Sequence, residues 1–391
     1  MYRKFSADTI FNGYELLQGQ VLITDSAGKI VDIKPESDAG EAIEKLDGII
    51  CPGFVNAHCH LELSHMKGLI PKHTGLVDFV LKVINERHFS DDEILDAIEK
   101  AEKEMLQNGI VAVGDICNNT LTIAQKAKGN LLYHNFIEAS GFPQSVAALR
   151  FKRATDIYNT YVEKFSATSI VPHAPYSVSP EIFKMINAFP GNSLITMHNQ
   201  EVEAENEFFR KGTGDFLRLY ENLGVDISFF KPQEKSSLQA VLPFFTELQT
   251  IILVHNVATS VADFEFAKQK IQNSKAEIFY CLCPNANKYI SNTLPDVNLL
   301  MQDRGNIVLG TDSLASNDQL SILEEIKTLQ VYFKDLDLAT LLQWATSNSS
   351  RALQMHGQLG SFEKGKQPGL ILIEGITNFR TDKNTSVQRI L

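Results

Sequence analysis

The feature that most constrains the fold is a series of eight short apolar runs, each followed by a stretch with helical patterning. Parallel strands need long crossover connections, usually helices, so this alternation predicts parallel strands. Eight repeats favour an α/β barrel over an open sheet, and such a barrel takes about 250 of the 391 residues. The expected strands are Ile49–Asn56, Ile110–Ile116, Leu131–Ala139, Ser169–Pro172, Ser193–Met197, Thr250–Val254, Glu277–Leu282 and Asn306–Gly310.

Helical patterns between these runs are clearest in Ser90–Gln107 and Leu320–Phe333. Ser90, followed three residues later by Glu93, predicts a capping box at the start of the first of these helices. The two ends of the chain differ, because residues 1–50 and Leu359–Glu374 alternate short β-like runs with turns. Neither end is long enough to bury a core alone, so we expect them to pair with each other.

Charge and composition exclude several classes of function. A formal net charge of −11 and an isoelectric point near 5.4 argue against nucleic-acid binding. The chain begins with no signal-peptide core and has no run of about 18 apolar residues, so we expect neither secretion nor a membrane span. Five cysteines, an odd number, favour reduced thiols in the cytoplasm over a disulfide framework.

Histidines gather at the expected carboxyl ends of the strands, which is where barrel enzymes carry their chemistry. Alternate residues of a strand point to one face, so His58 and His60 of the first run share a face. Imidazole nitrogens at that spacing suit zinc or iron. Later strands end in His173, His198-Asn-Gln-Glu201, His255-Asn and Gly310-Thr-Asp312, so five of the ten histidines lie at such ends.

Each of these residues has an ordinary structural alternative when taken singly. His173 could be a core residue, His198 and His255 could end buried strands, and Asp312 could cap a helix. Together, these alternatives require each histidine to lie at a strand end by a separate coincidence, so the set of residues favours a metal site. The remaining histidines do not fit the pattern: we expect His134 in the core and the others in solvent, namely His65, His73, His88 and His356.

The order of these motifs resembles the amidohydrolase superfamily, and within it the single-metal deaminases of cytosine, guanine, S-adenosylhomocysteine and aminodeoxyfutalosine. The resemblance covers almost the whole chain and implies a TIM-like (β/α)8 barrel over residues 51–357. It also implies a small β-sandwich built from residues 1–50 and 358–391. The matching motifs are Pro52-Gly-Phe-Val-Asn-Ala-His58-x-His60, His173-Ala-Pro-Tyr-Ser, His198-x-x-Glu201, His255-Asn, Cys283-Pro-x-x-Asn287, Leu309-Gly-Thr-Asp312-Ser-Leu-Ala-Ser-Asn317 and Gly360-Ser-Phe-Glu-Lys-Gly365-Lys.

The resemblance implies a role for each matching residue. Glu201 and His255 are expected to handle protons, and His173 to contact the substrate. Relatives with two metals carry a lysine at the end of the fourth strand, where this chain has none, so we expect one metal, Zn²⁺ first and Fe²⁺ as the alternative. The expected ligands are His58, His60, His198 and Asp312.

This residue set predicts hydrolytic deamination. Zinc held by three nitrogens and a carboxylate lowers the pKa of water to roughly 7. Asp312 would accept the proton of that water, and His255 would orient it. Glu201, with a pKa raised by burial, would protonate a ring nitrogen of the substrate. An amino-substituted heterocycle and water would then give the oxo product and ammonia.

The substrate is less constrained. We expect contacts from Glu62, Arg87, Glu138 and Asn287, and a lid in the segment Lys67–His88. The first candidate substrate is 6-amino-6-deoxyfutalosine, within the class of purine nucleosides and related adenine derivatives. Two alternatives stay open: a hydrolase of another bond, as in a triazine or cyclic amide, and an inactive binding barrel. A small-molecule substrate is expected, with neither nucleic acid nor membrane, and family habit suggests a homodimer.

Overall fold

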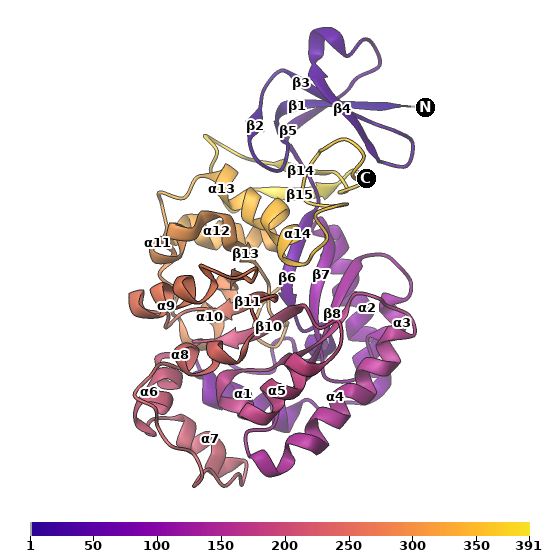
Figure 1. The fold of residues 1–391 in the computed structure, drawn as a ribbon. Coiled ribbons are helices and arrows are strands. Elements are labelled where there is room, and N and C mark those ends of the chain that lie inside the picture. The colour runs from indigo at the N-terminus through magenta and orange to yellow at the C-terminus, as the bar shows by residue number, and fades with distance from the viewer. Residues whose placement is uncertain (1) are drawn as a thin grey trace.

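The computed structural model describes residues 2–391, apart from the side chains of residues 303–305. The described residues form three β-sheets with helices around them (Figure 1). Two of the sheets have four parallel strands each, in the spatial orders β6-β7-β8-β9 and β10-β11-β12-β13. Their strands are β6 (Phe54–Cys59), β7 (Ile110–Cys117), β8 (Leu132–Ala139), β9 (Thr168–Pro172), β10 (Leu194–Asn199), β11 (Thr250–His255), β12 (Glu277–Leu282) and β13 (Ile307–Leu309).

Helices connect successive parallel strands and lie outside the two sheets (Figure 1), which is the α/β arrangement that the alternating pattern predicts. No helix among the described residues is long and apolar enough to cross a membrane. The helices are α1 (Leu76–Glu86), α2 (Asp91–Gln107), α3 (Ile123–Lys126), α4 (Ala147–Val162), α5 (Pro180–Ala188), α6 (Glu203–Lys211), α7 (Phe216–Asn222), α8 (Ser237–Val241), α9 (Val261–Ile271), α10 (Pro284–Ser291), α11 (Val297–Leu300), α12 (Ile322–Tyr332), α13 (Leu338–Gln343) and α14 (Ser349–Ala352).

Hydrogen bonds join the two parallel sheets at both of their edges. Beside β9, the backbone N–H of His198 donates to the carbonyl of His173 at 2.9 Å. At the other edge, the N–H groups of Thr311 and Asp312 donate to the carbonyl of His58 at 3.0 and 3.1 Å. These bonds lie at carboxyl ends of strands, so the contacts that join the sheets also bring predicted site residues together.

The close approach at the second edge depends on Gly310. A Cβ atom on Gly310 would lie 2.9 Å from the Cβ of His58 and 2.9 Å from the Sγ of Cys281. Separations this short are not tolerated between such atoms, so a larger residue would push β13 away from β6. Glycine is therefore required here for the close approach of two backbones.

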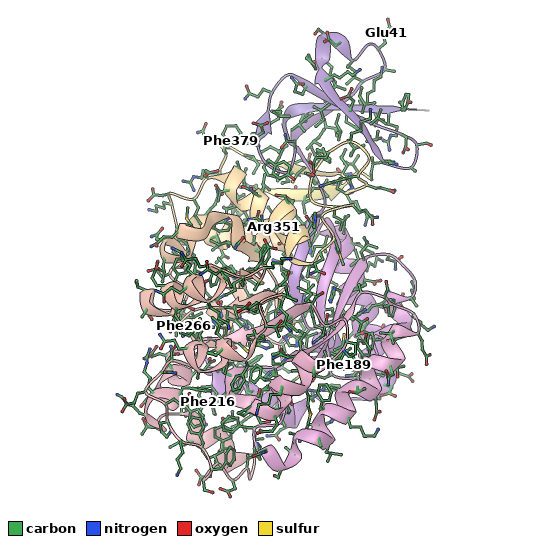
Figure 2. All side chains as sticks on the ribbon, in the orientation of Figure 1. Glu41, Phe189, Phe216, Phe266, Arg351 and Phe379 are labelled. Carbon is green, nitrogen blue, oxygen red and sulfur yellow. The ribbon has the colours of Figure 1, made fainter. Side chains whose placement is uncertain are left out.

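The third sheet, called the terminal sheet below, combines both ends of the chain. In it β5 pairs in parallel with β1 and antiparallel with β14, which confirms the predicted pairing of the two ends. Figure 2 shows Glu41, near this sheet, and Phe216 of α7 at opposite ends of the molecule. The terminal sheet has the order β15-β14-β5-β1-β3-β4, with β2 on β1; its strands are β1 (Arg3–Phe11), β2 (Leu16–Leu17), β3 (Gln20–Thr24), β4 (Ile30–Pro35), β5 (Glu44–Cys51), β14 (Ile371–Glu374) and β15 (Ser386–Arg389).

One predicted strand, Ile49–Asn56, is wrong. The structure divides this run: β5 ends at Cys51 in the terminal sheet, and β6 begins at Phe54 in a parallel sheet. Pro52, between them, has no N–H to donate to a ladder, so the first pairing stops there. Periodicity alone does not separate two buried strands that follow each other so closely.

In the expected β-like segment Leu359–Glu374, only Ile371–Glu374 forms a strand, whereas the other predicted strands and helices agree with the structure. The other seven expected strands lie within two residues of the observed ones at each end. Ser90 caps α2, because its Oγ accepts from the N–H of Glu93 while its own N–H donates to the Glu93 carboxylate. The predicted capping box is therefore confirmed, and α12 covers most of the second expected helix.

A buried ion pair links α3 to β7, and its carboxylate also binds the segment that follows β6. Lys126 Nζ lies 2.6 Å from Asp115 Oδ2, and both side chains are fully buried. Lys126 also donates to Asn135 Oδ1 at 2.8 Å. The second oxygen of Asp115 accepts a hydrogen bond from the N–H of Leu61 at 2.8 Å, directly after His60. The pair therefore supports the turn that carries His60.

We predict that Lys126→Met lowers the free energy of unfolding by about 3–5 kcal/mol, because it leaves the Asp115 carboxylate buried without its cation. Denaturant unfolding measures this change. The control is Lys100→Met, which removes a lysine paired with Asp96 on the surface of α2 and should change stability far less. Equal losses in the two variants would contradict the prediction.

Candidate active site

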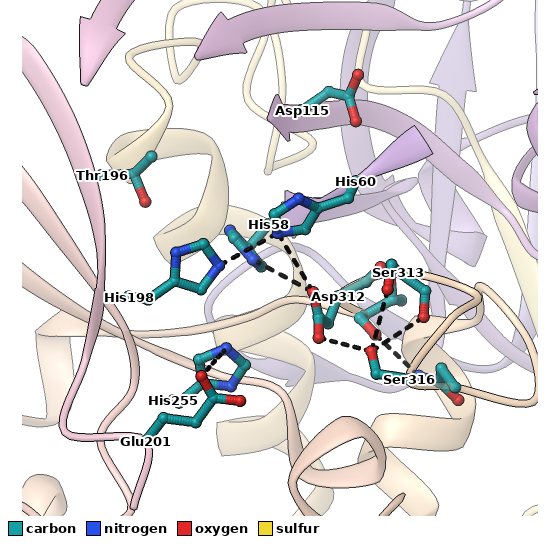
Figure 3. Close-up of polar contacts among 12 residues, drawn as sticks. His58, His60, Asp115, Thr196, His198, Glu201, His255, Asp312, Ser313 and Ser316 are labelled. Atoms are coloured by element: carbon teal, nitrogen blue, oxygen red, sulfur yellow. Dashed lines mark hydrogen bonds and ion pairs between the residues drawn. The ribbon is translucent and has the colours of Figure 1, made fainter. Parts of the chain in front are cut away.

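Three imidazoles from the ends of two strands converge at the carboxyl edge of the parallel sheets. His58 lies near the end of β6, His60 directly after β6, and His198 on β10. One nitrogen from each ring lies within 4.8 Å of the others, and His60 Nε2 is 3.2 Å from His198 Nε2 (Figure 3). Because alternate residues of a strand share a face, His58 and His60 reach the same point, as the sequence predicts.

Asp312 joins this group from the segment after β13. Its Oδ1 lies 3.6 Å from Nε2 of His58 and 3.4 Å from Nε2 of His60 (Figure 3). Its Oδ2 accepts a hydrogen bond from Ser316 Oγ at 2.6 Å. Asp312 has a φ of +57°, in the left-handed region, so the backbone itself helps to direct this carboxylate. The structure thus brings together all four predicted metal ligands.

Burial sets the charges in this group. It lowers the pKa of His60 well below its ordinary value and that of His198 to about 4, so both rings are neutral near pH 7. Burial alone would raise the pKa of Asp312, but the rings of His58, His60 and His255 close to its carboxylate hold it well below its usual range. Neutral nitrogens with one carboxylate form a donor set that suits a divalent metal such as zinc.

Two hydrogen-bonding details fit a metal at this point. Neither ring nitrogen of His58 has a hydrogen-bond partner among the described residues, although the ring is buried. Nδ1 of His198 and the carbonyl of His173 are 2.8 Å apart, so this nitrogen donates and Nε2 keeps its lone pair toward His60. Histidines that bind metals usually donate their other N–H in this way.

A second set of possible donors, Glu138, His173 and His198, shares one residue with the first. His198 cannot serve both sets, because its Nδ1 donates to a carbonyl and its Nε2 faces His60. The described donors therefore fit one ion better than two.

Glu201 and His255 lie beside this group. Glu201 Oε2 is 3.7 Å from Nε2 of His255 (Figure 3). Burial, with the negative charges of Asp312 and Glu205 nearby, raises the pKa of Glu201 well above its ordinary value, which favours the protonated form of its carboxyl. Burial lowers the pKa of His255 to about 3, so this ring is neutral. A proton donor thus stands next to a neutral imidazole.

A cavity of about 700 Å³ opens over these residues. Five of its lining residues are the predicted His60, His198, Glu201, His255 and Asp312. The predicted substrate contacts His173, Glu62, Arg87 and Glu138 line it as well. Most of the rest of the wall is apolar, and α1, α4 and α7 contribute part of it, including Phe79, Val83, Ile157 and Leu219. The expected lid segment therefore contributes one wall, through α1.

Asn287 has a different position from the one expected. It is buried, is not among the described residues that line the cavity, and its Nδ2 donates to Nδ1 of His255 at 3.0 Å. With Nδ1 as acceptor, the proton of the neutral His255 ring lies on Nε2, which faces Glu201. Asn287 therefore selects the tautomer of His255.

Asn118 lines the cavity and is missing from the predicted site. Its backbone N–H donates to Glu62 Oε2 at 2.9 Å, and its Nδ2 donates to Glu138 Oε2 at 2.8 Å. The other oxygen of each glutamate is buried without a hydrogen-bond partner among the described residues. Asn118 follows β7, the one strand end from which no residue was selected, and that position is the signal that could have found it.

Of the remaining histidines, His134 lies where the sequence predicts and His65 does not. His134 is buried on β8, as predicted, and its Nε2 lies 2.8 Å from Ser169 Oγ. His65 was expected in solvent, but it is half-buried, and its Nε2 lies 3.0 Å from the carbonyl of Arg87. The reason is that the turn after β6 packs against the end of α1, where this bond secures Arg87.

The comparisons with known proteins establish the family. The model of the Amidohydrolase family matches residues 49–390, so this chain belongs to that family. Among curated relatives, an adenosine deaminase of Helicobacter pylori is 25% identical over 83% of this chain and 78% of its own length. An aminodeoxyfutalosine deaminase of Nitratiruptor sp. is 24% identical over 94% of this chain and 93% of its own. The resemblance drawn from the motifs is confirmed.

Solved structures share the fold. The aminofutalosine deaminase of Helicobacter pylori, in complex with methylthio-coformycin, superposes with a TM-score of 0.82 at 22% identity, over 97% of this chain and 93% of that chain. An adenosine deaminase from Xanthomonas campestris with bound zinc gives a TM-score of 0.72 at 21% identity, over 95% and 84% of the two chains.

We predict that Asp312→Asn lowers metal affinity by more than about 100-fold, since it removes the one charged donor. Asparagine tolerates a left-handed backbone, so the fold should be kept. Ser316→Ala, which removes the hydrogen bond to Asp312 together with weaker ones to Ser313, should cost about 10–100-fold. Competition with a chelator measures both affinities. Wild-type affinity in Asp312→Asn would exclude Asp312 as a ligand.

Proposed function

We propose that this protein is a metal-dependent hydrolase that deaminates an adenine nucleoside derivative and releases ammonia. The observation that carries this function is the convergence of three imidazoles and a charged carboxylate with a protonated Glu201 and a neutral His255 in one cavity. Such a site combines an activator of water with a proton donor for the substrate ring.

The relatives support this substrate class. By their names they deaminate adenosine and aminodeoxyfutalosine. The aminodeoxyfutalosine deaminase aligns over nearly the full length of this chain and of its own. We therefore keep 6-amino-6-deoxyfutalosine as the first substrate to test. A triazine hydrolase from Arthobacter aurescens also superposes, with a TM-score of 0.71, but at 15% identity this likeness concerns the fold alone.

The proposed metal ligands are His58, His60, His198 and Asp312, and one zinc per chain is the first expectation, with iron as the alternative. A divalent metal, when bound, lowers the pKa of water enough to supply hydroxide near neutral pH. Asp312 is ionised and therefore able to accept a proton from the attacking water. His255 presents its Nε2–H beside the reacting atoms and would orient the water and stabilise developing charge.

Glu201 is the proposed general acid. Its raised pKa keeps a proton available to protonate the ring nitrogen next to the carbon that water attacks. The ionised Glu201 would then take up the hydroxyl proton as the oxo group forms, and Asp312 would pass the proton taken from water to the departing amino group, which leaves as ammonia. His173, Glu62, Arg87 and Glu138 are proposed to contact the substrate, and Asn287 acts on it only through His255.

We also propose a domain organisation for the chain. The hydrogen bonds at both edges of the parallel sheets support a closed TIM-like (β/α)8 barrel over residues 51–357. The small β-sandwich domain proposed for residues 1–50 and 358–391 would be built on the terminal sheet, which contains strands from both ends of the chain. A homodimer in the cytoplasm stays a prediction.

Metal content and ammonia release, measured together on protein purified without chelator, test this function. The panel is 6-amino-6-deoxyfutalosine, adenosine, S-adenosylhomocysteine, guanine and a triazine. We expect about one zinc per chain and ammonia from an adenine nucleoside. Turnover of the triazine alone would contradict the substrate class, and two metals or none would contradict the ligand set.

We predict that Glu201→Gln lowers kcat for deamination by about 10²–10⁴-fold, because the amide cannot supply the proton. Metal content should stay unchanged, since Glu201 is not a proposed ligand. The matched control is Glu203→Gln, two residues away on the exposed start of α6, where the side chain pairs with Arg210. A steady-state ammonia assay compares them, and similar kcat values in the two variants would exclude Glu201 as the acid.

A further inference from the structure

Glu201 and His255 come from two separate turns, and both turns contain left-handed residues. Gln200 has a φ of +47°, His255 of +76° and Asn256 of +59°. Non-glycine residues hold such angles only where the surrounding structure over-determines them, and these angles concentrate at functional sites. The contacts around the two turns must therefore hold these left-handed angles in place.

Gln200 is fully buried, and its side chain uses both ends of its amide. Nε2 donates to Asn206 Oδ1 of α6 and to Asp263 Oδ2 of α9, both at 3.0 Å. Oε1 accepts from Thr259 Oγ1 at 2.8 Å. A single side chain thus ties its own turn to two helices and to the loop after β11.

The backbone of Gln200 connects the same two turns. Its N–H donates to Glu205 Oε1 at 3.1 Å, and its carbonyl accepts from the N–H of Ala258 at 2.8 Å. Next to it, the carbonyl of Asn199 accepts from the N–H of Asn256 at 3.0 Å, and their side chains are also bonded at 3.1 Å. Every polar group of Gln200 is therefore engaged between the two turns or with α6 and α9.

We propose that Gln200 is a positioning residue that locks the turn bearing Glu201 to the turn bearing His255 and so sets their separation of 3.7 Å. This inference rests on the roles proposed above for Glu201 and His255. Gln200 itself is not among the described residues that line the cavity, so it acts only through its neighbours. Displacing a reacting group by about 1 Å costs roughly 10²-fold in rate, which is the scale of effect expected.

Gln249 provides a matched control at the opposite end of the same strands. It is also buried, its Nε2 donates to Asn187 Oδ1 at 3.2 Å and to the carbonyl of Asn192 at 3.3 Å, and its Oε1 accepts from Thr246 N–H at 2.8 Å. It precedes β11 and so lies far from the carboxyl ends. Gln200→Asn and Gln249→Asn therefore make the same chemical change, shortening a buried amide, at opposite ends.

Asparagine tolerates the left-handed angle of residue 200 but is one methylene too short to keep all of the side-chain bonds of Gln200. We expect Gln200→Asn to lower kcat about 10–100-fold, with KM and metal content close to wild type. Gln249→Asn should lose comparable thermal stability but keep its kcat. Thr259→Val, which removes only the bond to Oε1, should lower kcat in the same direction by less, and it tests the proposal if Gln200→Asn fails to fold.

A crystal structure of Gln200→Asn gives a readout that does not depend on turnover. We expect the distance between Glu201 and His255 to lengthen while the three imidazoles stay in place. An unchanged distance, or a loss of kcat no larger than in Gln249→Asn, would overturn the positioning role. Absence of ammonia from every nucleoside with the wild-type protein would instead overturn the proposed function, because the distance would still report on Gln200.

Discussion

The carbonyl of His58 holds the structure together at the point where the two parallel sheets meet. It accepts two backbone hydrogen bonds, from Thr311 and Asp312, and Gly310 permits the approach that these bonds require. The matching bond from His198 to the carbonyl of His173 joins the other edge. Each bond has a proposed site residue on at least one side, so the contacts that join the two sheets also bring the site residues together.

Burial also shifts the pKa values of the imidazole and carboxyl groups in the site. The same loss of water lowers the pKa of His60, His198 and His255 and raises that of Glu201. Asp312 differs only because imidazoles surround it and offset the cost of its burial. Two carboxyl groups in one cavity are thereby suited to opposite tasks, one accepting a proton and the other donating it.

Most of the fold and the central site followed from local patterns. Seven strands, the capping box of α2 and the convergence of His58, His60, His198 and Asp312 needed only periodicity and the rule that barrel chemistry lies at carboxyl ends. The strand expected at Ile49–Asn56 was wrong because the run is apolar throughout, and Pro52 divides it between two sheets that only tertiary pairing reveals.

The positions of the proposed site residues at the strand ends could be read from the chain alone, because the apolar runs locate those ends. The roles proposed for these residues come from the resemblance to the amidohydrolases. Only the tertiary structure decided how each is held. Contacts between segments distant in the chain place three amide side chains. Asn287 faces His255, Asn118 bonds to both Glu62 and Glu138, and Gln200 joins two turns. Amide side chains occur in any buried polar network, so their types and spacing predict no partner until the chain has folded.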